Sequence, residues 1–137
     1  MATTVHDLMT RDPRTVTPRT TVVEVARVMR DEDAGSLPVV EDERLVGTVT
    51  DRDVAIRVVA EGRPLETTVD EIATRELVTI DPQQDVDEAL RLMSEHQVRR
   101  LPVCEEDGRL VGILAQADVA RHASDERTGE TVERISR

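Results

Sequence analysis

The chain has 137 residues, a length that suits one compact domain or two small joined ones, and a formal net charge of −11. This charge repels phosphate polyanions, and no Phe, Tyr or Trp is present to stack on bases, so the composition argues against a DNA or RNA partner. The single cysteine excludes a disulfide framework, and with no signal peptide or long apolar run in view we expect a cytoplasmic protein without a membrane partner.

The first predicted elements are a brief extended piece and a helix. Residues 15–17 (Thr-Val-Thr) form an extended run that stops at Pro18. The pair Thr21 and Glu24 has the spacing of a capping box, which marks the start of a helix. Apolar residues then recur with helical period at Val22, Val25, Ala26, Val28 and Met29.

A β-hairpin and a second helix are predicted next. The β-rich runs Leu37–Val40 and Leu45–Thr50 are joined by a short polar turn at residues 41–43, which is typical of a hairpin. After Thr50, a helix is predicted from the apolar residues Val54, Ile56, Val58 and Val59. The sequence Gly-Arg-Pro at residues 62–64 then interrupts the pattern.

The same series of elements occurs a second time. A shift of 64 residues aligns the two copies, and an inserted residue near Gly108 raises the shift to 65. Identical residues recur at Val5/Val69, Thr10/Thr74, Pro18/Pro82, Val22/Val86, Met29/Met93 and Gly47/Gly112. The second copy predicts an extended piece at residues 79–81, a helix opened by Asp85 and Glu88, hairpin strands at Leu101–Cys104 and Leu110–Leu114, and a last helix from near Ala115.

Each copy is therefore predicted to fold as β-α-β-β-α. Together they give an α+β protein with pseudo-two-fold symmetry and a core shared between its halves. We place the two repeats at residues 1–62 and 63–123. Residues 124–137 are polar, and the sequence leaves open whether they form a tail or a short helix.

This duplicated order resembles two CBS domains in tandem, which form a CBS pair or Bateman module. The resemblance rests on the Leu-Pro-Val strands at 37–39 and 101–103 and on the segments GTVTDRDV (47–54) and GILAQADV (112–119). The stretch EHQVRRLPV (95–103) and the chain length are similar to small stand-alone bacterial CBS-pair proteins, including the actinobacterial hypoxic-response type.

The resemblance implies a ligand and an assembly. It implies adenosine-containing nucleotides in clefts between the repeats, so AMP, ADP, ATP, S-adenosylmethionine or NAD is expected as a regulatory ligand, with no required cofactor. It also implies a homodimer of modules that signals to a partner protein. The sequence leaves open which nucleotide binds, how many clefts it fills and whether the dimer is parallel or antiparallel.

Thr50 and Asp53 lie where a strand ends and a helix begins. One interpretation is a capping box, in which each side chain accepts a hydrogen bond from the other residue's amide. The other, implied by the resemblance, is that Asp53 binds a ribose diol and Thr50 assists. The second copy retains Asp118 but has Ala115 instead of the threonine, so Asp118 is the ribose candidate of a weaker or different site.

Arginines are the candidates for binding phosphate. The pair Arg99-Arg100 enters a strand of a very acidic chain, and a guanidinium matches phosphate oxygens. The first copy has Ser36 there, which offers a hydroxyl without charge, and Arg52 at its helix start is a further candidate. The alternatives are a solvated connection paired with Glu95 or Glu105–Glu106, and an exposed arginine at position 52.

Aliphatic side chains would have to hold the adenine ring, because the chain has no aromatic residue. The candidates are Val16, Ala34 and Pro38 from the first copy and Ile80, Val98 and Pro102 from the second. The alternative for each of them is an ordinary place in the core.

No catalytic or metal-binding motif stands out. The chain has no G-x-S-x-G, C-x-x-C or Walker sequence, and its three histidines match no ligand spacing, so we expect neither an enzyme nor a metal site. Cys104 in an apolar strand predicts a buried, inert thiol. The alternative function is a ligand-free structural or dimerisation module that acts through protein–protein contacts.

Overall fold

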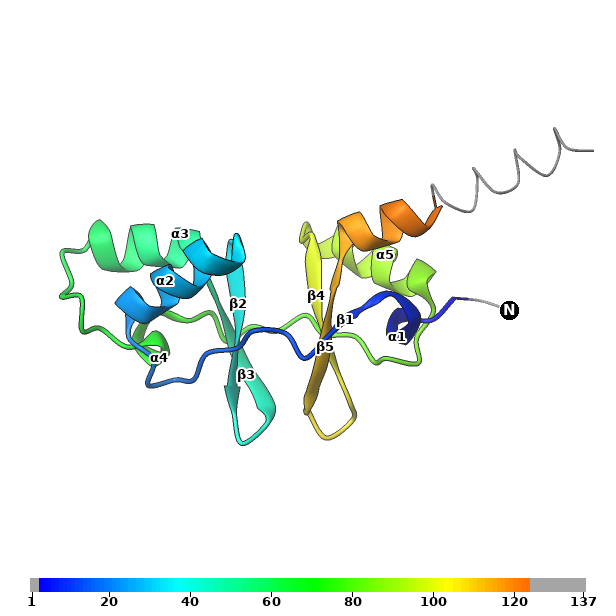
Figure 1. The fold of residues 1–137 in the computed structure, drawn as a ribbon, viewed down its shortest axis with the longest axis horizontal. Coiled ribbons are helices and arrows are strands. Elements are labelled where there is room, and N and C mark those ends of the chain that lie inside the picture. Colours follow the sequence, from blue (N-terminus) through cyan, green and yellow to red (C-terminus); the bar gives the residue numbers. More distant parts are fainter. Residues whose placement is uncertain (1–2, 124–137) are drawn as a thin grey trace, which may run out of the picture. The chain divides into compact units, whose positions relative to one another are not determined.

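The computed structural model describes residues 3–123 (Figure 1). They fall into two compact units. The repeat-1 unit contains residues 14–77 and 107–110, and the repeat-2 unit contains residues 78–106, those from Val111 onward and the N-terminal residues up to Pro13. The segment 124–137, for which the sequence allows a tail or a short helix, lies outside the described residues.

The repeat-1 unit is built on a hairpin. Strand β2 (Ser36–Glu41) pairs with the antiparallel strand β3 (Arg44–Thr50). Asp42 and Glu43 at the turn both have positive φ, 52° and 68°, as a two-residue type I′ turn requires. In Figure 1 the helices of this unit lie beside the hairpin; they are α2 (Val22–Glu32), α3 (Asp51–Val54) with its π-helical continuation η1 (Ala55–Val59), and α4 (Val69–Ile72).

The repeat-2 unit is built on a three-stranded sheet. Strand β5 (Leu110–Ala115) lies between β1 (Thr10–Arg11) and β4 (Arg100–Cys104), and β1 runs antiparallel to β5. The helices are α1 (Val5–Leu8) and α5 (Val86–His96), and residues 116–123 are also helical. The predicted α+β class and the repeated hairpins are therefore confirmed.

The two predicted extended pieces lie in equivalent places. Val16 forms a parallel bridge to Val39 of β2, and Ile80 forms one to Val103 of β4. The hydrogen bonds match as well, since the Val16 amide donates to the Pro38 carbonyl and the Ile80 amide to the Pro102 carbonyl, both at 3.1 Å. Each piece therefore pairs through a single bridge with the first strand of its hairpin.

The two long helices begin at the predicted caps. The Thr21 hydroxyl accepts a hydrogen bond from the Glu24 amide at 3.3 Å, so one of the two bonds of that capping box is formed. Asp85 accepts from the Asp87 amide at 2.8 Å. Each helix buries an apolar stripe and leaves its opposite face to solvent, as expected for an amphipathic helix.

The segment that begins each repeat, which contains α1 in the first repeat and α4 in the second, packs in the unit of the other repeat. In the repeat-1 unit, α4 comes from the second copy, and the Val69 amide donates to the Thr20 carbonyl while the Val22 amide donates to the Thr67 carbonyl, both at 2.9 Å. Both bonds satisfy amides in the first turn of a helix, which lack partners inside the helix.

The reciprocal arrangement is present in the repeat-2 unit. There α1 comes from the first copy, and the Val5 amide donates to the Gln84 carbonyl at 2.9 Å while the Val86 amide donates to the Thr3 carbonyl at 3.0 Å. A shift of 64 residues converts one pair of hydrogen bonds into the other. The two repeats therefore exchange equivalent segments.

A glycine in the second hairpin strand of each repeat allows the backbone of the exchanged segment to approach closely. A Cβ at Gly112 would lie 2.8 Å from the Thr10 carbonyl oxygen of β1. A Cβ at Gly47 would lie 3.0 Å from the carbonyl oxygen of Thr74, which pairs with Thr48. The glycine shared by the two motifs thus provides the space for backbone contact between segments of different repeats.

Each unit has its own core, and each core takes side chains from both repeats. The core of the repeat-1 unit contains Val16, Val22, Val25, Met29, Leu37, Val39, Val49, Val58, Val69 and Ile72. The core of the repeat-2 unit contains Val5, Ile80, Val86, Ala89, Met93, Leu101, Val103, Leu114 and Val119. The duplication predicts one core shared between the halves; the structure has two cores instead, and the exchanged helices contribute a side chain of one repeat to the core of the other.

Candidate functional site

Asp53 lies at the start of α3, directly after the end of β3. Its Oδ2 accepts a hydrogen bond from the Thr50 amide at 2.9 Å, and the Thr50 hydroxyl accepts from the Asp53 amide at 3.0 Å, so the capping box is complete. The residue is 8% exposed. Because Oδ2 is directed to the backbone, Oδ1 is the oxygen with the greater capacity to accept further hydrogen bonds.

Asp118 occupies the equivalent place in the repeat-2 unit. Its Oδ2 accepts from the Ala115 amide at 3.4 Å, although Ala115 has no hydroxyl to return the bond. Its Oδ1 is paired with the guanidinium of Arg121. The replacement of threonine by alanine therefore removes only one half of the cap, and the amide bond by itself gives the aspartate a structural role.

The polar candidates of the repeat-1 unit gather at the open end of its hairpin. Ser36 is the cross-strand partner of Thr50, so Ser36 lies beside the capping box. The Asp51 amide donates to the Gly35 carbonyl at 2.9 Å, which ties the start of β2 to the start of α3. Arg52, on the first turn of α3, is exposed.

An equivalent backbone bond orders the repeat-2 unit. The Gln116 amide donates to the Arg99 carbonyl at 2.7 Å, so Arg99 lies beside the helix that carries Asp118. Arg99 and Arg100 are exposed, and within residues 3–123 their side chains form no hydrogen bond or ion pair. The alternative pairing with Glu95 is not formed, because that carboxylate binds Arg91 at 2.6 Å.

The six adenine candidates belong to the cores or lie against them. Val16 and Ile80 are core residues, and Pro38 and Pro102 are buried beside them. Ala34 and Val98 are half-buried and pack against the same two clusters. Their core role is shown, and a role toward a ligand stays a prediction.

Sequence reasoning missed Arg57. Its Nε lies 3.8 Å from Asp53 Oδ1, and its Nη1 donates to the Ile72 carbonyl at 2.8 Å. The only signal in the sequence is the spacing of four residues from Asp53, which places the two side chains on one helix face. Nothing in the sequence shows that α4 lies within reach of the same guanidinium.

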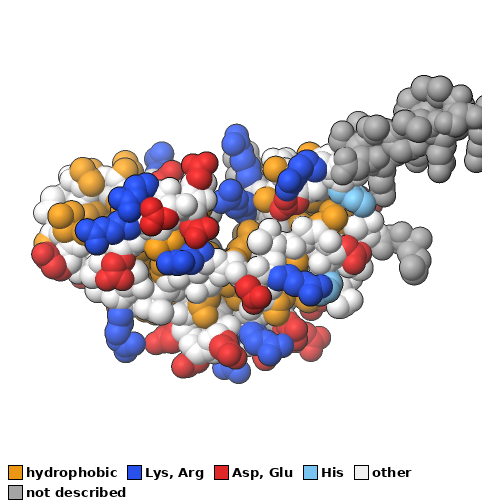
Figure 2. Space-filling view, viewed as in Figure 1, with side chains coloured by type: hydrophobic (Ala, Val, Ile, Leu, Met, Phe, Trp, Pro, Cys, Tyr) orange, Lys and Arg blue, Asp and Glu red, His pale blue; other side chains and the backbone are white. Residues whose placement is uncertain are grey.

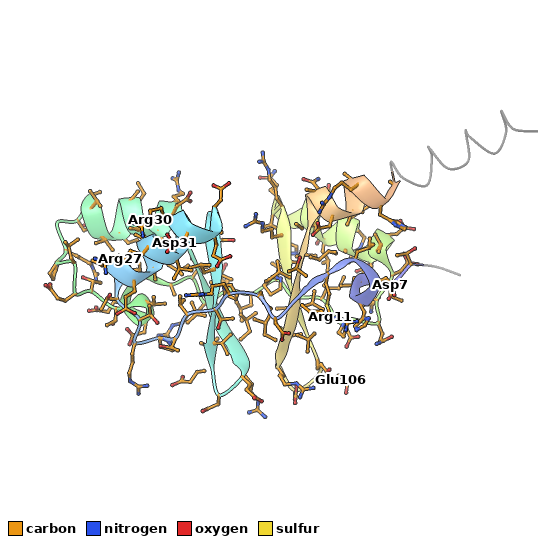
Figure 3. The ribbon with its side chains drawn as sticks, viewed as in Figure 1. Asp7, Arg11, Arg27, Arg30, Asp31 and Glu106 are labelled. Carbon is orange, nitrogen blue, oxygen red and sulfur yellow. The ribbon has the colours of Figure 1, made fainter. Side chains whose placement is uncertain are left out.

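An apolar depression lies on the repeat-1 unit, and we call its lining the α2–η1 face. It is lined by Val22, Val23, Ala26, Arg27, Arg30, Val54, Val58, Val59 and Leu65. Val59 is 71% exposed and Leu65 63% exposed. Figure 2 shows hydrophobic side chains here next to arginines, and Figure 3 labels Arg27 and Arg30 on α2.

Cys104 is buried at the end of β4, as predicted. Burial raises the pKa of its thiol to about 11 from an ordinary 9.0, because the apolar surroundings disfavour the thiolate. A raised pKa means that the neutral thiol stabilises the fold at low pH, and that this contribution is lost as the pH rises from about 9 through about 11.

We expect a disulfide reagent to modify Cys104 very slowly in the native protein at pH 8, where only about one thiol in a thousand would be ionised. The rate should rise about tenfold per pH unit up to the raised pKa. The coloured thiolate that the reagent releases measures this rate. The same measurement on the chain in denaturant gives the rate for an exposed thiol. Equal rates in the two states would contradict the buried position.

Residues 3–123 contain neither a cluster of metal ligands nor a membrane-spanning helix. No group of three or more His, Cys, Asp or Glu side chains in that part of the chain is placed to hold a metal ion. None of the helices described there combines the length and the apolar character needed to cross a membrane.

Known proteins resemble this chain over most of its length. The family model for the CBS domain matches residues 5–60 and 69–125. Hypoxic response protein 1 of Mycobacterium tuberculosis is 42% identical over 122 residues, which are 88% of this chain and 85% of the relative. A crystal structure of Hypoxic Response Protein I with two coordinated zinc ions has a TM-score of 0.78 and covers 88% of this chain and 98% of that one.

Two other solved structures contain ligands. The CBS domain pair of protein MJ0100, in complex with methylthioadenosine and S-adenosyl-L-methionine, has a TM-score of 0.80 at 28% identity and covers 92% of this chain and 99% of that one. CBSX2 in complex with AMP has a TM-score of 0.80 at 29% identity and covers 90% of this chain and 98% of that one.

Proposed function

We propose that this chain, which belongs to the CBS-domain family, binds an adenosine-containing nucleotide. The chain is a tandem pair of CBS domains, and such a pair is a regulatory module. The observation that carries the proposal is the buried carboxylate of Asp53, which is held at a strand end with Oδ1 directed away from its own cap. The AMP and S-adenosylmethionine complexes of similar structures support the same ligand class.

In this proposal Asp53 accepts hydrogen bonds from the two ribose hydroxyls. A carboxylate is suited to this because its bonds to hydroxyl donors are charge-assisted and its two oxygens match two adjacent donors. Thr50 holds the backbone at the site and adds a hydroxyl. Asp118 has the same role in the repeat-2 unit, where no threonine assists, so we expect weaker binding there.

Arginines would neutralise the phosphate. Arg99 and Arg100 have guanidinium groups without partners among the described residues, which leaves them available to an anion. Arg52 and Ser36 are the candidates on the repeat-1 unit. No residue has a catalytic role in the proposal. Regulation requires only that the ligand binds one conformation of the protein more tightly than another and so raises the population of that conformation.

An ultraviolet spectrum of the purified protein tests the proposal directly. With no Tyr or Trp, the chain itself is nearly transparent between 260 and 280 nm, so a nucleotide carried through purification gives a visible band near 260 nm. We expect this band to leave with the small-molecule fraction after denaturation. If the band is absent, thermal shifts with AMP, ATP, S-adenosylmethionine and NAD decide, and no shift with any of them would favour the ligand-free module.

We also propose that the module pairs with a second copy of itself through the α2–η1 face. Val59 and Leu65 expose apolar surface there, and Arg27 and Arg30 at its edge would lie against acidic side chains of the partner. The outer surface of α5 offers such side chains in Asp87 and in Glu88 and Glu95, which together bind the single guanidinium of Arg91. Contact between two α2–η1 faces would instead bring arginines together, so the charges favour a head-to-tail pair.

Sedimentation of charge variants tests this pairing. Leu65→Glu should convert the dimer to monomer at micromolar concentration, because it places a charge in an apolar contact. Ile56→Glu is the matched control, since Ile56 is half-exposed on η1, the helix that contributes Val58 and Val59 to the face, but does not itself line the face. An unchanged dimer in Leu65→Glu would place the contact elsewhere.

A further inference from the structure

We infer that Arg57 couples nucleotide occupancy at Asp53 to the docking of α4. The short helix α4 would then be the part of the protein that responds to the ligand. This inference rests on the proposed function, because it requires a ligand that engages the Asp53 carboxylate.

The geometry is a bridge through one guanidinium. Arg57 Nε lies 3.8 Å from Asp53 Oδ1, and Nη1 of the same side chain donates to the Ile72 carbonyl at 2.8 Å. Ile72 is the last residue of α4. A single side chain therefore contacts both the carboxylate proposed to bind the ribose and the end of a segment that comes from the second repeat.

The helix α4 depends on contacts of this kind. It spans only Val69–Ile72, and so short a helix is not stable by itself. Its last carbonyls have no partner inside the helix, and the guanidinium satisfies one of them. Its other attachments are the buried side chains of Val69 and Ile72 and the backbone bonds to residues 18 and 20, and the chain on either side of it bonds to Val22 and Thr48.

The coupling should be favourable. A ribose bound to Asp53 needs the carboxylate fixed in one orientation, and that orientation also places negative charge beside Arg57. Holding Arg57 there favours its bond to the Ile72 carbonyl, so ligand and α4 docking favour the same state. Because coupling between two sites is reciprocal, anything that removes the bridge should weaken both effects.

The repeat-2 unit divides the equivalent contacts between two side chains. The residue equivalent to Arg57 is His122, and Asp118 is paired instead with Arg121 from the preceding position. Among the described residues, Arg121 makes no hydrogen bond to α1, the helix equivalent to α4, whereas the His122 ring lies 3.3 Å from the hydroxyl of Thr3, just before α1. Arg121 thus contacts the aspartate without reaching the exchanged helix, and it provides a matched control for Arg57.

Amide hydrogen exchange of α4, with and without saturating AMP, tests the inference. The Ala73 amide, which donates to the Val69 carbonyl at 2.8 Å, reports opening of the helix. In the unmodified protein we expect AMP to slow its exchange about tenfold. In Arg57→Met we expect less than about a twofold change, together with roughly fivefold weaker AMP binding, and Arg57→Lys should restore part of both.

The ratio of exchange rates with and without AMP separates coupling from simple loss of stability, because a loosened α4 raises both rates. Arg121→Met should leave the ratio at Ala73 unchanged. An equal ratio in Arg57→Met and in the unmodified protein would overturn the inference while nucleotide binding stands. If none of AMP, ATP, S-adenosylmethionine and NAD binds the unmodified protein, the proposed function fails, and the inference fails with it.

Discussion

Replacing Asp53 by asparagine is expected to weaken nucleotide binding about tenfold to a hundredfold. Asparagine keeps the shape and can still accept the hydrogen bond from the Thr50 amide, so the cap of α3 is retained. It removes the charge that strengthens the bonds from the ribose hydroxyls, and hydrogen bonds to charged groups contribute about 1.5–3 kcal/mol. Calorimetric titration with AMP measures the change.

The equivalent change in the other unit is its control. Asp118→Asn should have a smaller effect on total binding, because the repeat-2 site lacks a threonine hydroxyl and its aspartate is already paired with Arg121. Unfolding temperatures of both variants show whether the fold is intact. Unchanged AMP affinity in Asp53→Asn would show that this aspartate is a helix cap and nothing more.

Replacing Ile72 by alanine is expected to cost about 2–5 kcal/mol of unfolding free energy. Ile72 is completely buried, and it packs in the repeat-1 core although it belongs to the second copy of the sequence. The loss is large beside the total stability of a small protein, which is about 5–15 kcal/mol. Urea unfolding followed by circular dichroism measures it.

The location of the damage tests the exchange of segments. Ile72→Ala should speed amide exchange in α2 of the repeat-1 unit and leave α5 of the repeat-2 unit little changed. Leu8→Ala is the matched variant, because Leu8 is the equivalent residue of α1, half-buried against the other core. It should have a smaller effect, located in α5. Loss of protection in α5 from Ile72→Ala would contradict the assignment of α4 to the repeat-1 core.

The elements of each repeat could be predicted because their signals are local. Thr21 caps α2, and the polar turn at residues 42–43 sets the register of the β2–β3 hairpin. These features depend on residues close together in sequence, where periodicity and turn chemistry apply directly. The duplication reinforced them, because each element could be checked against its second copy.

The exchange of α1 and α4 could not be predicted, for a reason that the duplication itself explains. The two helices share the pattern of a buried valine followed by an aliphatic residue three positions later, at Val5 and Val69. Either helix therefore offers the same surface to either core. Which core each helix joins depends on the path of the connecting chain, and the residue types do not predict that path.

The candidate site was predictable in its residues but not in its contacts. The sequence identified Asp53 and left the capping and ribose interpretations open, and the structure forms the cap without testing the ribose role. It gave no reason to connect Asp53 to Ile72, because that connection requires Arg57 to reach a segment fifteen positions further along the chain.

The exchange also bears on the origin of the protein. A single repeat cut from this chain would carry its leading helix attached but would lack the partner that receives it, and its own core would lack the helix that the other repeat supplies. Two such half-length chains could complete each other by swapping those helices, as domain-swapped dimers do. An ancestral gene of half this length would therefore encode an obligate dimer, and its duplication and fusion would turn contacts between two molecules into contacts within one.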